Sequence, residues 1–341
     1  MTDESRPCNV PFPMKRRWSA ARLVPAILTA WALLYVWERG APAQSPTNSA
    51  AHLGIGRSQL AQDLNHEAMK SFEAVLQTDP HNAEAREGEV KAAVTAALQA
   101  KLAGDNDGAL VYLVRARKYV PDDPGLLFDF GVQADAMRLY KDAEEALNKA
   151  LELRPADAQI VYALGHLELD EGKMPQAEAH LREYLKMRPD DASAHYGLGK
   201  LLHVVARNEE AKAELWRSIE LSPRQTESYY ELGDIELNLQ QDDEAAALFQ
   251  KVLGRNPKHG GALTGMGMVA YRKKDYATAD AYLQSAVLAA PEYAPGHFYR
   301  AMALARLGRK EEGEKELAQA RNLDEKQNRE HGGYVLFTPP R

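Results

Sequence analysis

Cysteine is almost absent from this chain, because Cys8 is the single one among 341 residues. A chain with one cysteine cannot build a disulfide framework, an iron–sulfur cluster or a thiolate zinc site by itself. An excess of basic residues is missing too: 42 Lys and Arg stand against 49 Asp and Glu, a formal charge of −7. This acidic balance argues against nucleic acid as a partner, which would require a basic face.

The motifs that usually mark enzymes are also missing. The sequence contains no P-loop, no GxSxG, no HExxH, no CxxC and no glycine-rich dinucleotide turn. Ten histidines are scattered without an i,i+4 pair, and a shared metal site for His166 and His203 is less favoured than ordinary polar surface. We therefore predict no catalytic, cofactor or metal site and expect a protein that is not an enzyme.

The N-terminal segment carries an export signal. Basic residues at 15–17 and 22 precede the apolar run Leu23–Trp37, which is short for a bilayer span of roughly 20 residues. Ala41-Pro42-Ala43 has the small-x-small pattern of a signal peptidase site. Residues 1–43 are therefore predicted to be a cleaved signal peptide, with the body periplasmic or secreted. The alternative is an uncleaved signal anchor over 18–37, the only expected membrane contact, which would hold the body outside the cytoplasm on the inner membrane.

The remaining body is more acidic than the whole chain. Residues 1–43 hold six basic and three acidic side chains, which leaves 36 basic and 46 acidic residues and a charge of −10. Residues 44–48 are polar and are predicted to be a short linker.

Several residue types recur every 34 positions through the body, and such periodicity is typical of repeat proteins. Prolines, glycines and alanines each form a row, and a large apolar residue follows four places after each alanine. The rows are Pro121, Pro155, Pro189, Pro223, Pro257 and Pro291; Gly131, Gly165, Gly199, Gly233 and Gly267; Ala109, Ala143, Ala177, Ala211, Ala245 and Ala279; and Leu113, Leu147, Leu181, Leu215, Phe249, Leu283 and Leu317.

Each 34-residue unit predicts two amphipathic helices and two turns. Proline ends the second helix, because it disfavours helical geometry in the preceding residue. A glycine inside a helix costs about 1 kcal/mol relative to alanine. Its recurrence in five units therefore indicates a close approach between two helices, and the alanine row plays the same part on the second helix.

The pattern resembles the tetratricopeptide repeat. In one unit the motif positions are Tyr229, Leu232, Gly233, Ala245, Phe249, Val252 and Pro257, with Val252 in place of the usual alanine. The resemblance implies an all-α fold, a right-handed superhelical solenoid of about eight units over 49–327. The units begin at residues 49, 83, 124, 158, 192, 226, 260 and 294.

Two units depart from the pattern. The second has seven extra residues and no helix breaker before Gly104, which predicts a first helix two turns longer. The eighth has Glu325 where proline would stand, as expected of a terminal repeat. Residues 328–341 form a tail that either folds back over the last helix or docks a partner as an extended strand.

The resemblance implies a concave groove, lined by the first helices, that binds other proteins or peptides. Aromatic and methionine side chains at 34-residue spacing are expected to face it. The alternative is that the tyrosines of this set pack against the neighbouring unit. The candidate residues are Phe128, Tyr162, His166, Tyr196, Lys200, His203, Tyr230, Asp234, Met268, Tyr271 and Phe298.

These observations favour a non-enzymatic, exported scaffold or adaptor for protein–protein interaction in the cell envelope. A membrane-anchored assembly factor or a periplasmic chaperone for envelope or secreted clients is the alternative. An enzyme or a carbohydrate-binding module with an unfamiliar site is the least favoured.

Overall fold

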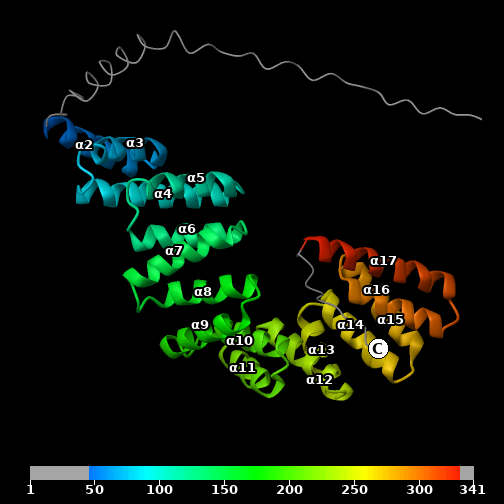
Figure 1. Ribbon diagram of the computed structural model, residues 1–341. Coiled ribbons are helices and arrows are strands. Elements are labelled where there is room, and N and C mark those ends of the chain that lie inside the picture. The colour runs from blue at the N-terminus through cyan, green and yellow to red at the C-terminus, as the bar shows by residue number, and fades with distance from the viewer. Residues whose placement is uncertain (1–45, 331–341) are drawn as a thin grey trace, which may run out of the picture. The chain divides into compact units, whose positions relative to one another are not determined.

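The computed structural model describes residues 46–330, and within them the chain is all-helical, with sixteen helices and no strand (Figure 1). The predicted signal segment and residues 331–341 of the predicted tail lie outside the described residues. No helix of the described part combines the length and apolar character that a membrane crossing requires.

The helices alternate between the first and the second helix of each predicted unit. The first helices are α2 (Pro46–Ala61), α4 (Ala83–Leu102), α6 (Pro124–Ala136), α8 (Ala158–Asp170), α10 (Ala192–Val204), α12 (Thr226–Asn238), α14 (Gly260–Arg272) and α16 (Ala294–Arg306). The second helices are α3 (Asn65–Leu76), α5 (Asn106–Arg117), α7 (Tyr140–Leu153), α9 (Met174–Met187), α11 (Asn208–Leu221), α13 (Asp242–Arg255), α15 (Tyr276–Ala289) and α17 (Lys310–Glu330).

Seven of the eight predicted units begin at the first residue of a helix, from Ala83 in α4 to Ala294 in α16. Two boundaries differ from the prediction, and one unusual helix length agrees with it. Helix α2 starts at Pro46, so residues 46–48 are helical rather than linker, and α17 continues through 328–330, which the sequence assigned to the tail. Helix α4 has 20 residues where α6 has 13, which confirms the two-turn extension.

The chain divides into two compact units, Met1–Ala96 and Ala97–Arg341, and the division falls inside α4. In the first unit, the buried Phe72 of α3 fits against Gly56 and Gly88. In the second unit, each helix from α5 to α17 packs against the next along the chain, as in a solenoid. Because the two units are described separately, one continuous solenoid over 49–327 stays a prediction.

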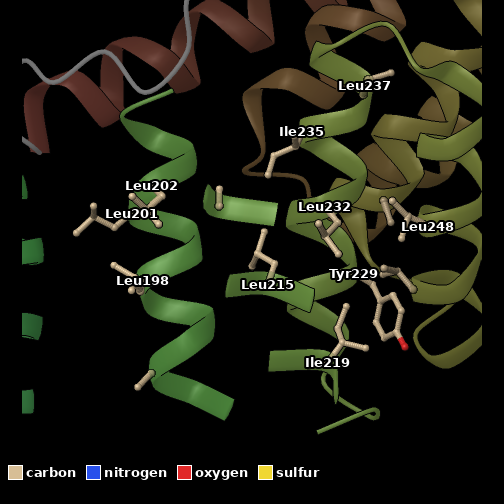
Figure 2. Packing of buried hydrophobic residues seen from close by; sticks show 14 of the residues in the cluster. Leu198, Leu201, Leu202, Leu215, Ile219, Tyr229, Leu232, Ile235, Leu237 and Leu248 are labelled. Carbon is tan, nitrogen blue, oxygen red and sulfur yellow. The ribbon is translucent and has the colours of Figure 1, made fainter. Parts of the chain in front are cut away.

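The core of the second unit is built from buried apolar side chains, many of them leucines, in one cluster from Val161 to Val269 and a smaller one around Leu283. Figure 2 shows part of it, where Leu198 and Leu202 of α10, Leu215 of α11 and Leu232 of α12 are each at most 1% exposed. The alanine row from Ala109 to Ala279 is buried to the same degree. Both rows therefore have the packing role that their periodicity predicts.

The glycine row makes room for the large apolar row. A Cβ atom built on Gly131, Gly165, Gly199, Gly233 or Gly267 would lie 2.5–3.3 Å from the side chain found 16 residues later, at Leu147, Leu181, Leu215, Phe249 or Leu283. Such distances are shorter than van der Waals contact. The close approach inferred from the glycines is thus an approach of the first-helix backbone to a side chain of the second helix.

The turn inside each unit contains a further row, spaced by 34 residues from Gly104 onward and by 41 between Asp63 and Gly104. This row is not visible as a residue type. Its members have a positive φ between 56° and 80° and are Asp63, Gly104, Arg138, Gly172, Ala206, Gln240, Lys274 and Gly308. The next residue donates its N–H to the carbonyl five positions back, for example Arg207 to Leu202 at 2.8 Å. This is the Schellman arrangement that ends a helix.

The turn between units has a different chemistry. The residue before each proline is extended, with φ of −135° at Arg154 and −130° at Asn256. Aspartates then cap several first helices, and Asp191 accepts the N–H groups of Ser193 and Ala194. Asp191 thus satisfies N–H groups at the start of α10 that have no partner inside the helix.

Substitution by alanine is expected to have opposite effects on stability at two glycines of α10. Gly199→Ala should destabilise the protein by about 1–3 kcal/mol, because the new Cβ would lie 2.7 Å from the Cγ of Leu215. Gly197→Ala should stabilise it by about 1 kcal/mol, because no atom lies within 4 Å of its Cβ position and alanine is the better helix former. Urea unfolding of the two variants measures both effects, and equal signs would contradict this packing.

Candidate functional site

The predicted site residues fall into three groups along the first helices of the second unit. Phe128 lies on α6, and Tyr162 and His166 lie on α8. A second group on α10 and α12 consists of Tyr196, Lys200, His203, Tyr230 and Asp234. Met268 and Tyr271 on α14 and Phe298 on α16 form the third group.

The first group lines a cavity of about 450 Å³ between α6 and α8. Its walls are mainly aromatic and aliphatic, with few polar groups, as is usual for pockets that take a ligand. The lining residues are Phe128, Val132, Asp135, Leu147, Gln159, Tyr162, Ala163, His166 and Tyr184. Sequence reasoning thus found three of the nine as site candidates.

Tyr162 is the centre of an aromatic cluster in this cavity. Its ring centroid lies 4.5 Å from that of His166, edge to face, and 4.7 Å from that of Tyr184. Both separations are typical of favourable ring pairs. Partial burial lowers the pKa of His166, so its ring is neutral at physiological pH.

Tyr184 is held in place from the neighbouring repeat. Its hydroxyl donates a hydrogen bond to Oδ2 of Asp191 at 2.6 Å, while Oδ1 of Asp191 caps α10. Burial, together with the hydrogen bond and charge of Asp191, raises the pKa of Tyr184 to about 12. Residues at 34-residue spacing from Tyr184 include Ala116, Ala150 and Ala286. The replacement of alanine by tyrosine in this row is the feature of the sequence that could have identified Tyr184 as a site residue.

Asp135 is the carboxylate of the cavity, and sequence reasoning missed it. Its Oδ1 is buried and accepts no hydrogen bond from any described residue. Burial, followed by the charges of Asp170 and Glu171, raises the pKa of Asp135 to about 6. Asp135 stands 68 residues before His203, in the same 34-residue row, and this spacing could have identified it.

In the second group, His203 lies between two carboxylates. Its Nδ1 is 3.3 Å from Oε2 of Glu231, and its Nε2 is 3.6 Å from Oδ2 of Asp234. Burial opposes protonation, but the hydrogen bond to Glu231 and the two charges outweigh it and raise the pKa of His203. Asp234 also accepts a hydrogen bond from Asn238 at 3.2 Å. Burial and nearby glutamates raise the pKa of Tyr196 to about 12, while Lys200 is exposed.

Tyr230 packs against the next repeat. Its ring occupies the space that a Cβ on Gly261 would need, at 2.7–2.8 Å, and its centroid is 4.9 Å from that of His259. Burial raises the pKa of its hydroxyl, which also hydrogen bonds to Tyr293. These contacts are those of the packing alternative, so Tyr230 is a weaker contact candidate than Tyr162.

The third group is spread over two helices. Tyr271 accepts a hydrogen bond from Nε of Arg306 at 3.2 Å, and its ring is 5.3 Å from that of Tyr276. Phe298 forms an edge-to-face pair with Tyr299 at 5.2 Å, and Met268 packs against the leucine core. Among the described residues, no cluster of three or more His, Cys, Asp or Glu could hold a metal ion.

Substitutions of His203 and His166 are expected to change the stability of the protein with opposite pH dependence. Because the folded-state pKa of His203 is raised, its contribution to stability is present below the unfolded pKa and is lost as pH rises through the folded one. His203→Gln should therefore destabilise the protein more at pH 5.5 than at pH 8. The lowered pKa of His166 gives His166→Gln the reverse trend. Denaturant unfolding at both pH values measures this, and parallel trends would contradict the assignment.

Comparison with solved structures finds other helical repeat proteins. The Cut9–Hcn1 hetero-tetramer of the APC/C has a TM-score of 0.56 at 15% identity, over 90% of this chain and 59% of that one. PilF of Pseudomonas aeruginosa has 0.49 at 20% identity, over 62% and 93%. MamA of Desulfovibrio magneticus RS-1 has 0.47 at 23%, over 50% and 97%. At such identities the Cut9–Hcn1 match shows the solenoid fold alone.

No curated protein sequence matches this chain. Three family models, each described as a tetratricopeptide repeat, do match, at residues 136–201, 226–259 and 264–326. These segments contain α7–α9 with most of α10, α12 with α13, and most of α14–α17, in the helix-pair register seen in the structure. The chain therefore carries tetratricopeptide repeats.

Proposed function

We propose that this protein is a non-enzymatic scaffold that binds other proteins or peptides through the first helices of its repeats. The cavity between α6 and α8 is the observation that carries the proposal. Its aromatic rings are rigid and give a large contact area at a low cost in conformational entropy. An open hollow of about 450 Å³ with such walls suits one or two side chains of a docked polypeptide.

We propose further that the scaffold works in the cell envelope. The basic residues before Leu23–Trp37 and the Ala41-Pro42-Ala43 site support export of the body. The acidic charge of −10 over 44–341 favours protein partners over nucleic acid. A membrane-anchored assembly factor or periplasmic chaperone is the second candidate, and the length of 18–37 favours it if this segment is kept.

The cavity predicts which substitutions abolish binding. The full-length protein, with a C-terminal affinity tag, is crosslinked in cells, and proteins enriched over an untagged strain are quantified by mass spectrometry. Tyr162→Ala and Phe128→Ala should each lower the recovery of the same partners about tenfold or more, as expected for aromatic anchors.

Trp216→Ala is the matched control, because Trp216 is an aromatic residue on the second helix α11 and is 42% exposed. It should leave recovery unchanged. Equal loss with Trp216→Ala, or full recovery with Tyr162→Ala, would refute binding through the cavity. Loss of helix content in Tyr162→Ala, measured by circular dichroism, would assign Tyr162 to packing instead.

The proposed export predicts the N-terminus of the mature protein. Cleavage after Ala43 should leave Gln44 as the first residue and release the body from membranes washed with carbonate. Edman or mass-spectrometric sequencing of the native protein, combined with fractionation, tests this. An intact residue 1–43 segment in the membrane fraction would favour the anchored alternative, and an intact segment in the cytosol would overturn export altogether.

A further inference from the structure

The proposed function leaves open which chemistry the cavity recognises, and the following inference rests on that function. We infer that the cavity between α6 and α8 binds a basic side chain of the partner polypeptide, with the cationic head at Asp135 and the aliphatic stem along Phe128, Val132 and Tyr162. Arginine fits this site best, because its planar head both stacks on aromatic rings and donates paired hydrogen bonds to a carboxylate.

The walls of the cavity match the stem of a long basic side chain. Lysine and arginine bury their methylene groups along apolar surfaces while the head remains polar. Phe128 and Val132 supply one apolar wall from α6, and Tyr162 supplies the facing wall from α8. Tyr162 and Tyr184, with ring centroids 4.7 Å apart, add aromatic surface to this lining.

Asp135 is the group that would receive the head. Its Oδ1 is buried without a hydrogen-bond donor in residues 46–330, and no ion pair of Asp135 is found there. Asp135 as a whole is half-buried, and a partly desolvated carboxylate without a partner is destabilising. A guanidinium that entered the cavity would supply the missing donors and the missing charge together.

The charges around Asp135 select a cation over an anion. Asp170 and Glu171 both repel a negative charge at Asp135. Lys173 is the nearby base, and it is occupied by Glu171 and Glu144, each at 3.0 Å from its Nζ. An acidic side chain would therefore meet repulsion in this cavity, and a neutral one would leave Asp135 without a partner.

The binding test uses the full-length protein and two fluorescein-labelled peptides of glycine and serine. One peptide carries three arginines, and the other has citrulline, a neutral isostere, at the same positions. Fluorescence anisotropy at pH 7.5 should show the arginine peptide bound at least tenfold more tightly than the citrulline peptide. Asp135→Asn should remove at least nine-tenths of that difference.

Glu152→Gln is the control for general attraction to an acidic protein, because Glu152 is an exposed carboxylate on the second helix α7. It should change the affinity for the arginine peptide less than twofold. An equal loss with Glu152→Gln and Asp135→Asn would overturn the inference, as would an unchanged affinity in Asp135→Asn.

The pH dependence gives an independent readout. Asp135 titrates near pH 6, so affinity for the arginine peptide should fall about tenfold between pH 7.5 and pH 5. Asp135→Asn should lose most of this dependence. The lining tyrosines Tyr162 and Tyr184 have raised pKa values and stay neutral over this range. His166 gains positive charge as the pH falls, and the variant His166→Gln removes that contribution to the pH dependence.

A thermal unfolding measurement shows that the variant is folded. The folded-state pKa of Asp135 is raised, so its ionised form lowers stability above pH 6, and this loss disappears below the unfolded pKa. Without bound peptide, the Asp135→Asn variant should thus have a higher melting temperature than the wild type at pH 7.5, and nearly the same melting temperature at pH 4. A lower melting temperature at pH 7.5 would show that Asp135 is stabilised by partners in the free protein, and would overturn the inference.

The two proposals fail in distinguishable ways. If Tyr162→Ala abolishes partner recovery in cells while Asp135→Asn affects neither recovery nor the arginine peptide, the scaffold function stands and the basic specificity falls. If Tyr162→Ala leaves partner recovery intact, the proposed binding through the cavity falls, and the specificity inferred from it falls as well.

Discussion

The fit of one large side chain per repeat against one glycine is the contact on which the second unit depends. Each pair, such as Gly199 with Leu215, sets how closely a first helix approaches its second helix. Because the pair recurs in five repeats, from Gly131 with Leu147 to Gly267 with Leu283, these repeats share the same contact between their two helices. A side chain at the glycine would push the helices apart, and the alanine row could no longer be buried. Packing of this kind leaves little freedom for the backbone.

Identical repeats place equivalent residues on one face, and the site arises where a repeat departs from its neighbours. Tyr184 stands in a row that is otherwise occupied mostly by small residues, such as Ala150 and Ala286. Its ring cannot be buried in the space of an alanine methyl group. It lies instead beside Tyr162 and is fixed through Asp191 to the cap of α10. Tyr184 therefore contributes to the lining of the cavity.

Much of the fold could be predicted because its determinants are residue types at fixed spacing. Prolines at 34-residue spacing mark the ends of the second helices, and the unit starts predicted from Ala83 to Ala294 coincide with helix starts. The left-handed turn row was not predictable in this way, since Asp63, Arg138 and Ala206 share a conformation and no chemistry. There the conformation is imposed by the Schellman hydrogen bonds of the turn.

The site was predicted less completely than the fold, for a physical reason. Periodicity tells which residues share a face, and this was enough to select Phe128, Tyr162 and His166. It does not tell which of them meet the next repeat, so Tyr230 was selected although its ring packs on Gly261. Nor does it tell which carboxylate is desolvated, because burial depends on side chains from other helices.

Asp135 shows how far stability alone accounts for this sequence. Asparagine has nearly the same shape and would avoid the cost of a half-buried charge beside Asp170 and Glu171. A residue that a neutral isostere could replace with a gain in stability is not explained by folding. Such residues are typical of binding sites, where a group is left unsatisfied until the ligand arrives. The same unsatisfied carboxylate that weakens the free protein would then supply the specificity of the complex.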